Sequence, residues 1–206
     1  MIKILDHPLV AHSMTQLRDK NSTSEQFRSA ARRICYHLAI EATKNLETTQ
    51  FEIKTPLESL NGKEISDSVV LLPVLRAGLV MLEPFLDLIP QAKTGYAGMR
   101  RNEKTLEAEE YYFSIPRFDS NTQVIVLDVM LATGNTAAAT LSRLEFEGAV
   151  GITVASIIAA PDGIEKIRSE FPDVRIITAT LDRGLNKNGY IVPGLGDAGD
   201  RVNATF

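Results

Sequence analysis

Apolar positions at helical spacing predict a long helix near the start of the chain. Ser22 is followed three residues later by Glu25, a spacing typical of a capping box at a helix N-terminus. The apolar residues that follow would face one side of a helix: they are Phe27, Ala30, Ala31, Ile34, Leu38 and Ala42. We therefore predict a long N-terminal helix that begins near residue 22.

From residue 68 onward, short β-branched runs alternate with helical patterns. The runs are SVVLLPVL (68–75), TQVIVLDV (122–129), GITVASIIAA (151–160) and VRIITATL (174–181). The helical patterns between them are GLVMLEPFLDLI (78–89), NTAAATLSRLEFEG (135–148) and DGIEKIRSEF (162–171). This alternation predicts an α/β fold with a parallel sheet flanked by helices. We expect one domain over residues 1–206.

Two segments interrupt the alternation. Residues 93–118 (KTGYAGMRRNEKTLEAEEYYFSIPRF) are too charged for a core strand and are expected to form a β-hairpin or flexible flap. The tail, residues 186–206, holds four glycines and a proline between Gly189 and Gly199. Such a segment is ordered only where a ligand or neighbouring residues fix it.

Composition narrows the range of partners. The net charge of −4 gives no long-range attraction to nucleic acid. Cys35 is the only cysteine, which excludes a disulfide framework and favours a reducing, cytoplasmic setting. No segment reaches the roughly 18 apolar residues of a membrane helix. His7, His12 and His37 are too scattered to suggest a catalytic triad.

The segment VIVLDVMLATGNTAAATL predicts a phosphate-binding turn between a strand and a helix. A helix N-terminus beyond a parallel strand favours an anion, and Gly134 would let backbone approach it closely. Thr133 and Thr136 add hydroxyl donors, and Asp128 can accept hydrogen bonds from ribose hydroxyls. The lysine of a Walker loop and the glycines of GxGxxG are missing. An ordinary helix cap is the alternative.

LDVMLATGNT resembles the loop that binds 5-phosphoribosyl 1-diphosphate (PRPP) in type I phosphoribosyltransferases. The segments HPLVAHSMTQLRDKNSTSEQFR, LPVLRAGLVM, MRRNEKTL and GYIVPGLGDAGDR resemble the uracil-specific branch, so the likeness runs from about His7 to Arg201. The family loop usually has proline where this chain has Val129, and Gly-Ser where it has Asn135 and Thr136. Asn tolerates left-handed backbone and Thr keeps the hydroxyl, which favours retained phosphate binding.

The resemblance implies a uracil phosphoribosyltransferase, which joins PRPP to N1 of uracil and forms uridine monophosphate (UMP) and pyrophosphate. It implies PRPP contacts at Arg76, Arg101, Asp128, Val129, Met130, Leu131, Ala132, Thr133, Gly134, Asn135, Thr136 and Asp197. It implies uracil contacts, largely through main chain, at Ile191, Gly196, Asp197 and Ala198. It also implies a loop at Arg76–Ala77 that can hold a strained non-proline peptide.

Three of these residues are the catalytic candidates. Arg76 and Arg101 carry guanidinium groups that match phosphate oxygens and can stabilise leaving pyrophosphate. Asp197 is the best candidate for a general base, and positioning of ribose or metal is its alternative. For Arg100, Arg101 and Lys104, a solvated charged loop is the competing interpretation.

Mg²⁺ is the expected cofactor. It would be held mainly by PRPP, because the sequence shows no dedicated metal-ligand cluster. The resemblance also implies a homodimer or higher homo-oligomer and raises GTP as an effector, a question that the sequence leaves open. Two other functions stay open at this point: a phosphoribosyltransferase for another base, and a non-catalytic nucleotide-binding regulator on the same fold.

Overall fold

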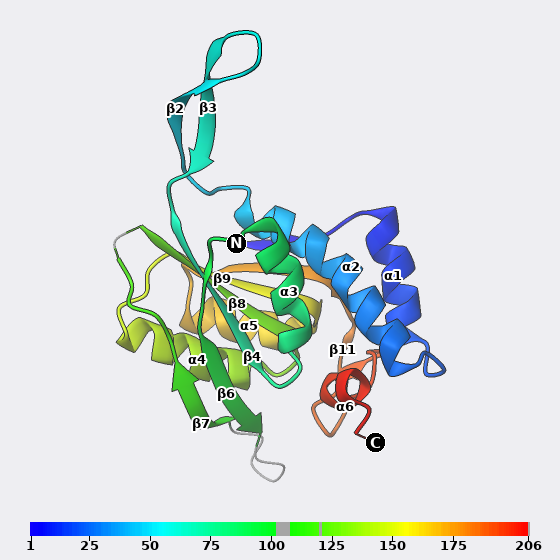
Figure 1. The fold of residues 1–206 in the computed structure, drawn as a ribbon. Helices are drawn as coiled ribbons and strands as arrows, with labels where there is room; N and C mark the ends of the chain where they lie inside the picture. The colour runs from blue at the N-terminus through cyan, green and yellow to red at the C-terminus, as the bar shows by residue number, and fades with distance from the viewer. Residues whose placement is uncertain (102–107, 120, 206) are drawn as a thin grey trace.

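A central sheet in strand order β1-β10-β9-β8-β4-β6-β7 organises the chain (Figure 1). The computed structural model describes residues 1–101, 108–119 and 121–205, with the side chain of Arg101 left out. Neighbouring strands among these residues pair in parallel, except for β6 with β7. The strands are β1 (Ile2–Ile4), β4 (Ser68–Leu75), β5 (Lys93–Thr94, beside β4), β6 (Tyr96–Arg101), β7 (Ala108–Ser114), β8 (Thr122–Leu131), β9 (Ile152–Ala159) and β10 (Arg175–Leu181).

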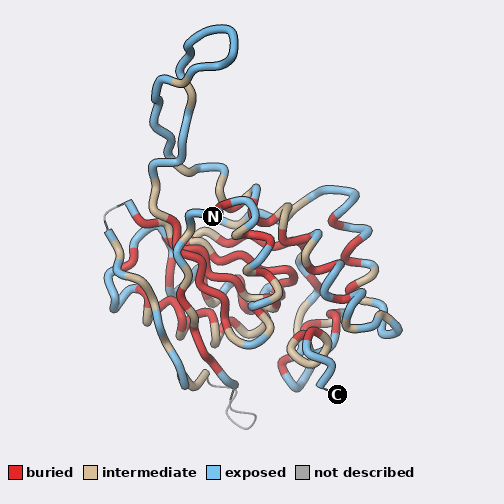
Figure 2. The backbone as a smooth tube through the Cα atoms, in the orientation of Figure 1, coloured by how far each residue is buried: buried red, intermediate tan, exposed pale blue. Residues whose placement is uncertain are grey.

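Helices cover both faces of this sheet, as the alternation of patterns predicts. One face carries α1 (Pro8–Arg18), α2 (Ser24–Thr43) and α3 (Leu79–Leu88), and the other carries α4 (Asn135–Phe146) and α5 (Pro161–Glu170). Alternate residues of the central strands enter the two cores; Ile125 and Leu127 face α2 and α3, whereas Val124 and Val126 face α4 and α5. Buried backbone therefore concentrates in the middle of the molecule (Figure 2).

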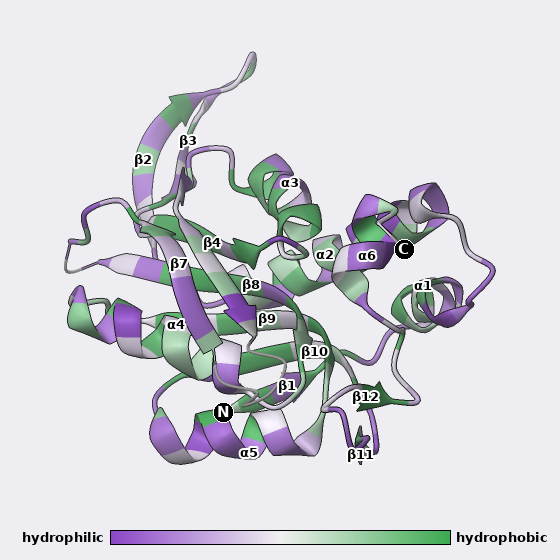
Figure 3. Ribbon diagram, turned by 90° about the horizontal axis from the view of Figure 1, so that it is seen from below, coloured by the Kyte–Doolittle hydropathy of each residue, from purple (hydrophilic) through white to green (hydrophobic). Residues whose placement is uncertain are grey.

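Strands β4 and β8 are coloured largely hydrophobic in Figure 3. This composition suits strands that are covered on both faces and explains why continuous apolar runs predicted them correctly. None of the helices in the described ranges combines the length and hydrophobicity needed to cross a bilayer.

The start of α2 lies one residue later than the predicted capping box. Thr23 is the N-cap, its side chain accepts a hydrogen bond from Gln26 N–H, and the Gln26 side chain bonds back to Thr23 N–H. Ser22 does not cap the helix, because its hydroxyl donates to the carbonyl oxygen of Gln16 at 2.7 Å. The prediction of Ser22 and Glu25 was therefore wrong, although every predicted apolar position of this helix is buried.

A two-stranded antiparallel hairpin, β2 (Thr48–Lys54) with β3 (Ser59–Ile65), projects from the body of the fold (Figure 1). The sequence did not predict it. Most of its residues are exposed, so no core-facing alternation marks the two strands. Helix α1 was also missed; its N-cap is His7 and its first residue is Pro8.

The segment expected as a hairpin or flap forms the antiparallel pair β6 and β7. Its connection, residues 102–107, lies outside the described residues. The tail contains β11 (Gly184–Leu185), β12 (Ile191–Val192) and the short helix α6 (Ala198–Asn203), which packs against α2. Neighbouring residues thus order the glycine-rich tail, which was one of the two conditions stated for it.

Candidate active site

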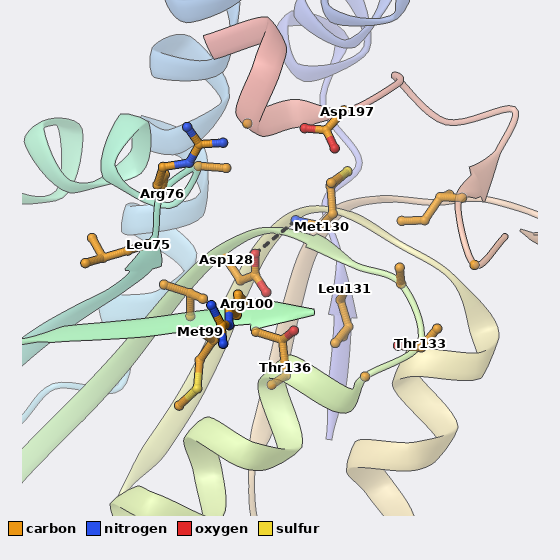
Figure 4. Close-up of a pocket in the computed structure, with 18 of the residues that line it drawn as sticks. Leu75, Arg76, Met99, Arg100, Asp128, Met130, Leu131, Thr133, Thr136 and Asp197 are labelled. Atoms are coloured by element: carbon orange, nitrogen blue, oxygen red, sulfur yellow. Dashed lines mark hydrogen bonds between the residues drawn. The ribbon is translucent and has the colours of Figure 1, made fainter. Parts of the chain in front are cut away.

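A cavity of about 390 Å³ opens at the carboxyl ends of β4 and β8, the edge where ligands of open α/β sheets bind. We call it the strand-end pocket (Figure 4). Four segments line it: the turn after β4, strands β6 and β7, the end of β8 with the loop to α4, and the tail. Its lining residues are Val74, Leu75, Arg76, Ala77, Met99, Arg100, Tyr111, Asp128, Met130, Leu131, Ala132, Thr133, Gly134, Thr136, Ala137, Gly189, Tyr190, Ile191, Asp197 and Gly199.

The loop between β8 and α4 points the N-terminus of α4 at this pocket. Gly134 is the N-cap residue, and its φ of 80° lies in the left-handed region that favours glycine. No side chain caps the helix from this position, so the first turn can offer amide groups and its positive dipole end to an anion. Thr133 and Thr136 add hydroxyls on either side of Gly134.

Gly163 of α5 supports this loop from behind. A Cβ atom added at Gly163 would lie 2.5 Å from the carbonyl oxygen of Ala132 and 2.9 Å from that of Leu131. A Cβ atom on Gly134 would in turn lie 3.1 Å from the carbonyl oxygen of Gly163. The loop and the helix therefore lie too close together to admit a side chain at Gly163 without a shift of the backbone.

Asp128, near the end of β8, is a half-buried acid of the pocket. Its carboxylate accepts a hydrogen bond from Met130 N–H at 3.4 Å, drawn as a dashed line in Figure 4. Burial raises the pKa of Asp128 to about 6, and amide hydrogen bonds from Met130 and Val129 offset only part of this effect. An ionised Asp128 is thus left with unmet hydrogen-bonding capacity that hydroxyl groups of a ligand could satisfy.

Arg76 follows β4 in a tight turn whose first peptide bond, Leu75–Arg76, is cis. The non-proline peptide expected in this loop therefore lies one bond before Arg76–Ala77. Gly78 closes the turn; its N–H donates to the carbonyl oxygen of Val74 at 2.9 Å. The Arg76 side chain extends toward the tail, since a Cβ atom added at Gly199 would be 3.9 Å from its Nη2 atom.

The tail contributes Ile191 and Asp197 to the pocket. Asp197 is the N-cap of α6, and its Oδ1 atom accepts a hydrogen bond from Asp200 N–H at 3.0 Å. This bond holds the carboxylate in place beside the cavity (Figure 4). The tail thus brings a carboxylate to the opposite side of the cavity from the loop after β8.

Most of the predicted site residues meet in this pocket. Four of them do not line it: Val129 is buried against the α2 and α3 face, Ala198 is buried in the same core, and Asn135 and Gly196 also lie outside the lining. The side chain of Arg101, a predicted catalytic residue, and all of Lys104 lie outside the described residues, so their predicted roles stay predictions.

The predicted contact residues did not include several residues that line the pocket, above all Tyr111, Tyr190 and Gly199. Arg100, for which a solvated charged loop was the competing interpretation, also lines the pocket, where it pairs with Glu109 across the β6–β7 hairpin at 2.8 Å. Alternation along β7 could have placed Tyr111 and Phe113 on one face. Of these two residues, Tyr111 lines the pocket and Phe113 packs against the core on the α4 and α5 face.

Metal ligands are sparse in the pocket. Among the described residues, no group of three or more His, Cys, Asp or Glu side chains is arranged to hold a metal ion. Asp128 and Asp197 nevertheless offer carboxylate oxygens, which hard divalent cations prefer, from two sides of one cavity.

Comparisons with known proteins agree on one family. A model of the family described as uracil phosphoribosyltransferase matches residues 4–205. The chain is 47% identical to a uracil phosphoribosyltransferase of Thermosipho melanesiensis, with 99% of each chain covered, and 45% identical to one of Dictyoglomus thermophilum, with 100% of each covered.

Solved structures show the same fold. A protein from Aquifex aeolicus, 36% identical, superposes with a TM-score of 0.95 over 100% of this chain and 99% of that one. An adenine phosphoribosyl transferase from Trypanosoma brucei, 14% identical, superposes with a TM-score of 0.61 over 94% and 87% of the two chains. At that identity the second likeness concerns the fold alone, which is that of the type I phosphoribosyltransferases.

Proposed function

Because the chain belongs to the uracil phosphoribosyltransferase family, we propose that its strand-end pocket holds PRPP and uracil together and transfers the phosphoribosyl group to N1 of uracil. The chain is an enzyme, a glycosyltransferase of pyrimidine salvage, and its products are UMP and pyrophosphate. One observation supports this placement above the others: residues 128–136, which we call the phosphate loop, surround a single cavity together with Arg76 and the tail.

The phosphate loop would bind a phosphate of PRPP, and Asp128 would accept hydrogen bonds from the ribose hydroxyls. A carboxylate with a raised pKa gains most from such donors, because burial has removed part of the water that would otherwise solvate it. Both groups lie on the same loop, so they can hold the sugar and its phosphate at a constant separation.

Arg76 would act on the leaving group. Negative charge accumulates on pyrophosphate as the bond to the anomeric carbon breaks, and a guanidinium group stabilises this state more than the ground state. Asp197 lies on the tail beside Ile191, where it can accept the proton that uracil N1 releases or orient the ribose. Arg101 stays a proposed second cation for the pyrophosphate.

We infer that Mg²⁺ assists, as phosphoribosyltransferases generally use it with PRPP. The donor set fits, since Asp128 and Asp197 are oxygen ligands that would complete a shell formed mainly by PRPP itself. The ion would neutralise part of the charge on the pyrophosphate. A homo-oligomer and an effector role for GTP are further proposals, and the assay below includes GTP for this reason.

The tail is proposed to choose the base through its main chain. Uracil offers two carbonyl acceptors and the N3–H donor, whereas cytosine turns an amino donor toward a backbone donor. Each unpaired buried group costs about 1–3 kcal/mol. With PRPP, Mg²⁺ and GTP present, we expect nucleotide from radiolabelled uracil at a rate at least about 100-fold above that from cytosine or hypoxanthine.

Three outcomes of this assay are distinct. Product from uracil alone supports the proposed function. Equal product from another base would keep PRPP binding and contradict the role of the tail. No product from any base, with the protein folded, would contradict the function and favour the regulator.

Replacing Gly163 by alanine is expected to impair PRPP binding. The added Cβ would meet backbone of the phosphate loop, which must shift, and a misplacement near 1 Å can cost about 100-fold in rate. We expect kcat/KM for PRPP to fall about 10- to 100-fold, with a smaller change in KM for uracil. Steady-state kinetics with each substrate varied in turn would measure this.

Gly62→Ala is the matched control, because a Cβ there makes only ordinary contacts of 3.4–3.6 Å with the Ile53 side chain on the β2–β3 hairpin. It should leave both KM values within about twofold of the parent protein. Equal kinetics for Gly163→Ala and Gly62→Ala would show that the close packing of loop and α5 has no role in PRPP binding.

A further inference from the structure

The tail is joined to the end of helix α1 through a network outside the strand-end pocket. Arg18, the last residue of α1, forms a bidentate pair with Asp182, with distances of 2.8 Å from Nη1 to Oδ2 and 2.5 Å from Nη2 to Oδ1. The same Nη1 atom donates to the carbonyl oxygen of Gly194 at 2.9 Å. The Oδ2 atom of Asp182 also accepts a hydrogen bond from Gly194 N–H at 2.7 Å.

Asp182 is held by the sheet. It follows the last residue of β10, its N–H donates to the carbonyl oxygen of Ala159 at 2.9 Å, and only 7% of the residue is exposed. Burial alone would raise the pKa of Asp182. The hydrogen bonds from Arg18 and Gly194 and the charge of Arg18 outweigh burial, so the pKa lies below its ordinary value. Asp182 is thus a buried carboxylate whose partners are Arg18 and the tail.

A second arginine, on the tail itself, donates hydrogen bonds to the end of α1. Arg201 of α6 donates through Nη1 to the carbonyl oxygens of Leu17 and Leu195, the latter at 2.8 Å, and through Nη2 to that of Asp19 at 2.6 Å. Leu17 belongs to the last turn of α1, where carbonyl oxygens lack partners within the helix. The Arg201 guanidinium also lies 4.6 Å from the centre of the Phe27 ring.

The residues held in this way stand between the tail residues that line the pocket. Gly194 and Leu195 lie in the sequence between Ile191 and Asp197. Gly194 has a φ of 67°, and a Cβ atom there would collide with the carbonyl oxygen of Ile191. A shift of Gly194 would therefore be passed directly to Ile191, one of the residues proposed to contact uracil.

We propose that Arg18, Asp182 and Arg201, which we call the tail anchor, are positioning residues that set how the main chain of the tail meets uracil. This inference rests on the proposed function, in which the tail reads the base. None of the three lines the strand-end pocket. They act by holding residues 191–197 against α1 and the end of β10.

The test is Asp182→Asn, which keeps the size of the side chain and removes its charge. The amide has one acceptor atom, so its NH2 group must face either Arg18 Nη2 or the Arg18 Nη1 and Gly194 N–H donors, and at least one of the three hydrogen bonds to this side chain is lost. We expect KM for uracil to rise about tenfold or more, KM for PRPP to stay within twofold, and the preference for uracil over cytosine to fall. A loss of packing alone would not raise KM for uracil and lower the base preference while KM for PRPP stays unchanged.

The chain provides a matched control at the other end of β10. Arg175, the first residue of that strand, pairs with Glu41 at 2.8 Å and donates to the carbonyl oxygens of Glu41 and Ala42 at 2.9 and 3.3 Å. Its side chain and that of Glu41 are 15% and 17% exposed. Glu41→Gln therefore breaks a comparably placed arginine–carboxylate pair and should leave the ratio of the two KM values unchanged.

Arg18→Lys and Arg201→Lys extend the test in case Asp182→Asn does not fold. A lysine keeps the charge and loses the planar fork. Each of these variants should therefore raise KM for uracil, but by less than Asp182→Asn does. Folding of every variant would be checked by its thermal transition.

Two results would overturn the tail anchor. One is an equal rise in both KM values for the anchor variants, and the other is a base preference identical to that of the parent protein in folded variants. Failure of the proposed function itself would look different, since the parent protein would then form no UMP at all.

Discussion

Asp128→Asn is expected to reduce kcat/KM for PRPP by about 100-fold or more while making the protein more resistant to urea at pH 8. The loss of activity follows because the variant lacks the carboxylate that would accept hydrogen bonds from two ribose hydroxyls. Each such bond to a charged group contributes about 1.5–3 kcal/mol. The gain in stability follows from the environment of the side chain, which disfavours the charged form.

The direction in which pH changes the stability follows from the pKa of Asp128 in the folded and in the unfolded chain. Burial raises the pKa of folded Asp128 to about 6 from its ordinary value of 3.8, so the unfolded chain releases this proton first as pH rises. The contribution of Asp128 to the free energy of unfolding therefore decreases between about pH 4 and pH 6 and stays low above that. With each pKa unit near 1.4 kcal/mol and the side chain partly exposed, we expect a difference of about 1–3 kcal/mol at pH 8.

Urea denaturation of the parent and Asp128→Asn proteins at pH 4.5 and pH 8, without substrate, would measure this difference. Asp119→Asn is a control of opposite sign, because hydrogen bonds from Thr122 and Asn121 lower the pKa of Asp119. It should lose stability at pH 8. The kcat/KM of the parent protein for PRPP should also decline below about pH 6, as Asp128 is protonated. An Asp128→Asn protein with unchanged kcat/KM would exclude the proposed ribose contact.

Arg76→Met is expected to lower kcat by about 100- to 1,000-fold, the range found when a group that stabilises developing charge is removed. Methionine keeps much of the length of the side chain and removes the cation that would meet pyrophosphate. Uracil does not use this charge, so KM for uracil should change little. Single-turnover measurement of pyrophosphate release would show whether the chemical step is the one that slows.

A second arginine in the same pocket provides the comparison. Arg100 already pairs with Glu109 on the neighbouring strand, so less of its charge is available to a ligand. We expect Arg100→Met to reduce kcat less than about tenfold. If the two variants lost kcat equally, Arg76 would have no special part in pyrophosphate departure. Arg76→Lys should lie between the parent and Arg76→Met, because a point charge replaces a bidentate fork.

Local sequence was sufficient for the central strands, their helices and the phosphate loop. Continuous apolar runs such as VVLL and VIVL predict strands covered on both faces, and α4, with Gly134 at its N-cap, begins where the loop pattern places it. These features depend on backbone preferences and on spacing within some ten residues. The alternation of strands and helices between residues 68 and 181 was therefore predicted correctly without any knowledge of their contacts.

Competing local bonds and exposed strands limited the prediction. The capping box forms at Thr23 and not at the predicted Ser22, because Ser22 bonds to a residue of the preceding helix. No local pattern reveals that bond. The β2–β3 hairpin was missed because neither face packs against the core.

By itself, then, the sequence determined the α/β architecture and the position of the loop that is proposed to bind phosphate, since each depends on neighbours along the chain. Only the tertiary structure decided that Arg76, Asp128 and Asp197 face one cavity, that burial raises the pKa of Asp128, and that Arg18 and Asp182 hold the tail at Gly194. Arg18 and Gly194 are 176 residues apart. Such contacts arise when the sheet brings distant strand ends together, and desolvation exists only once surrounding segments have removed the water.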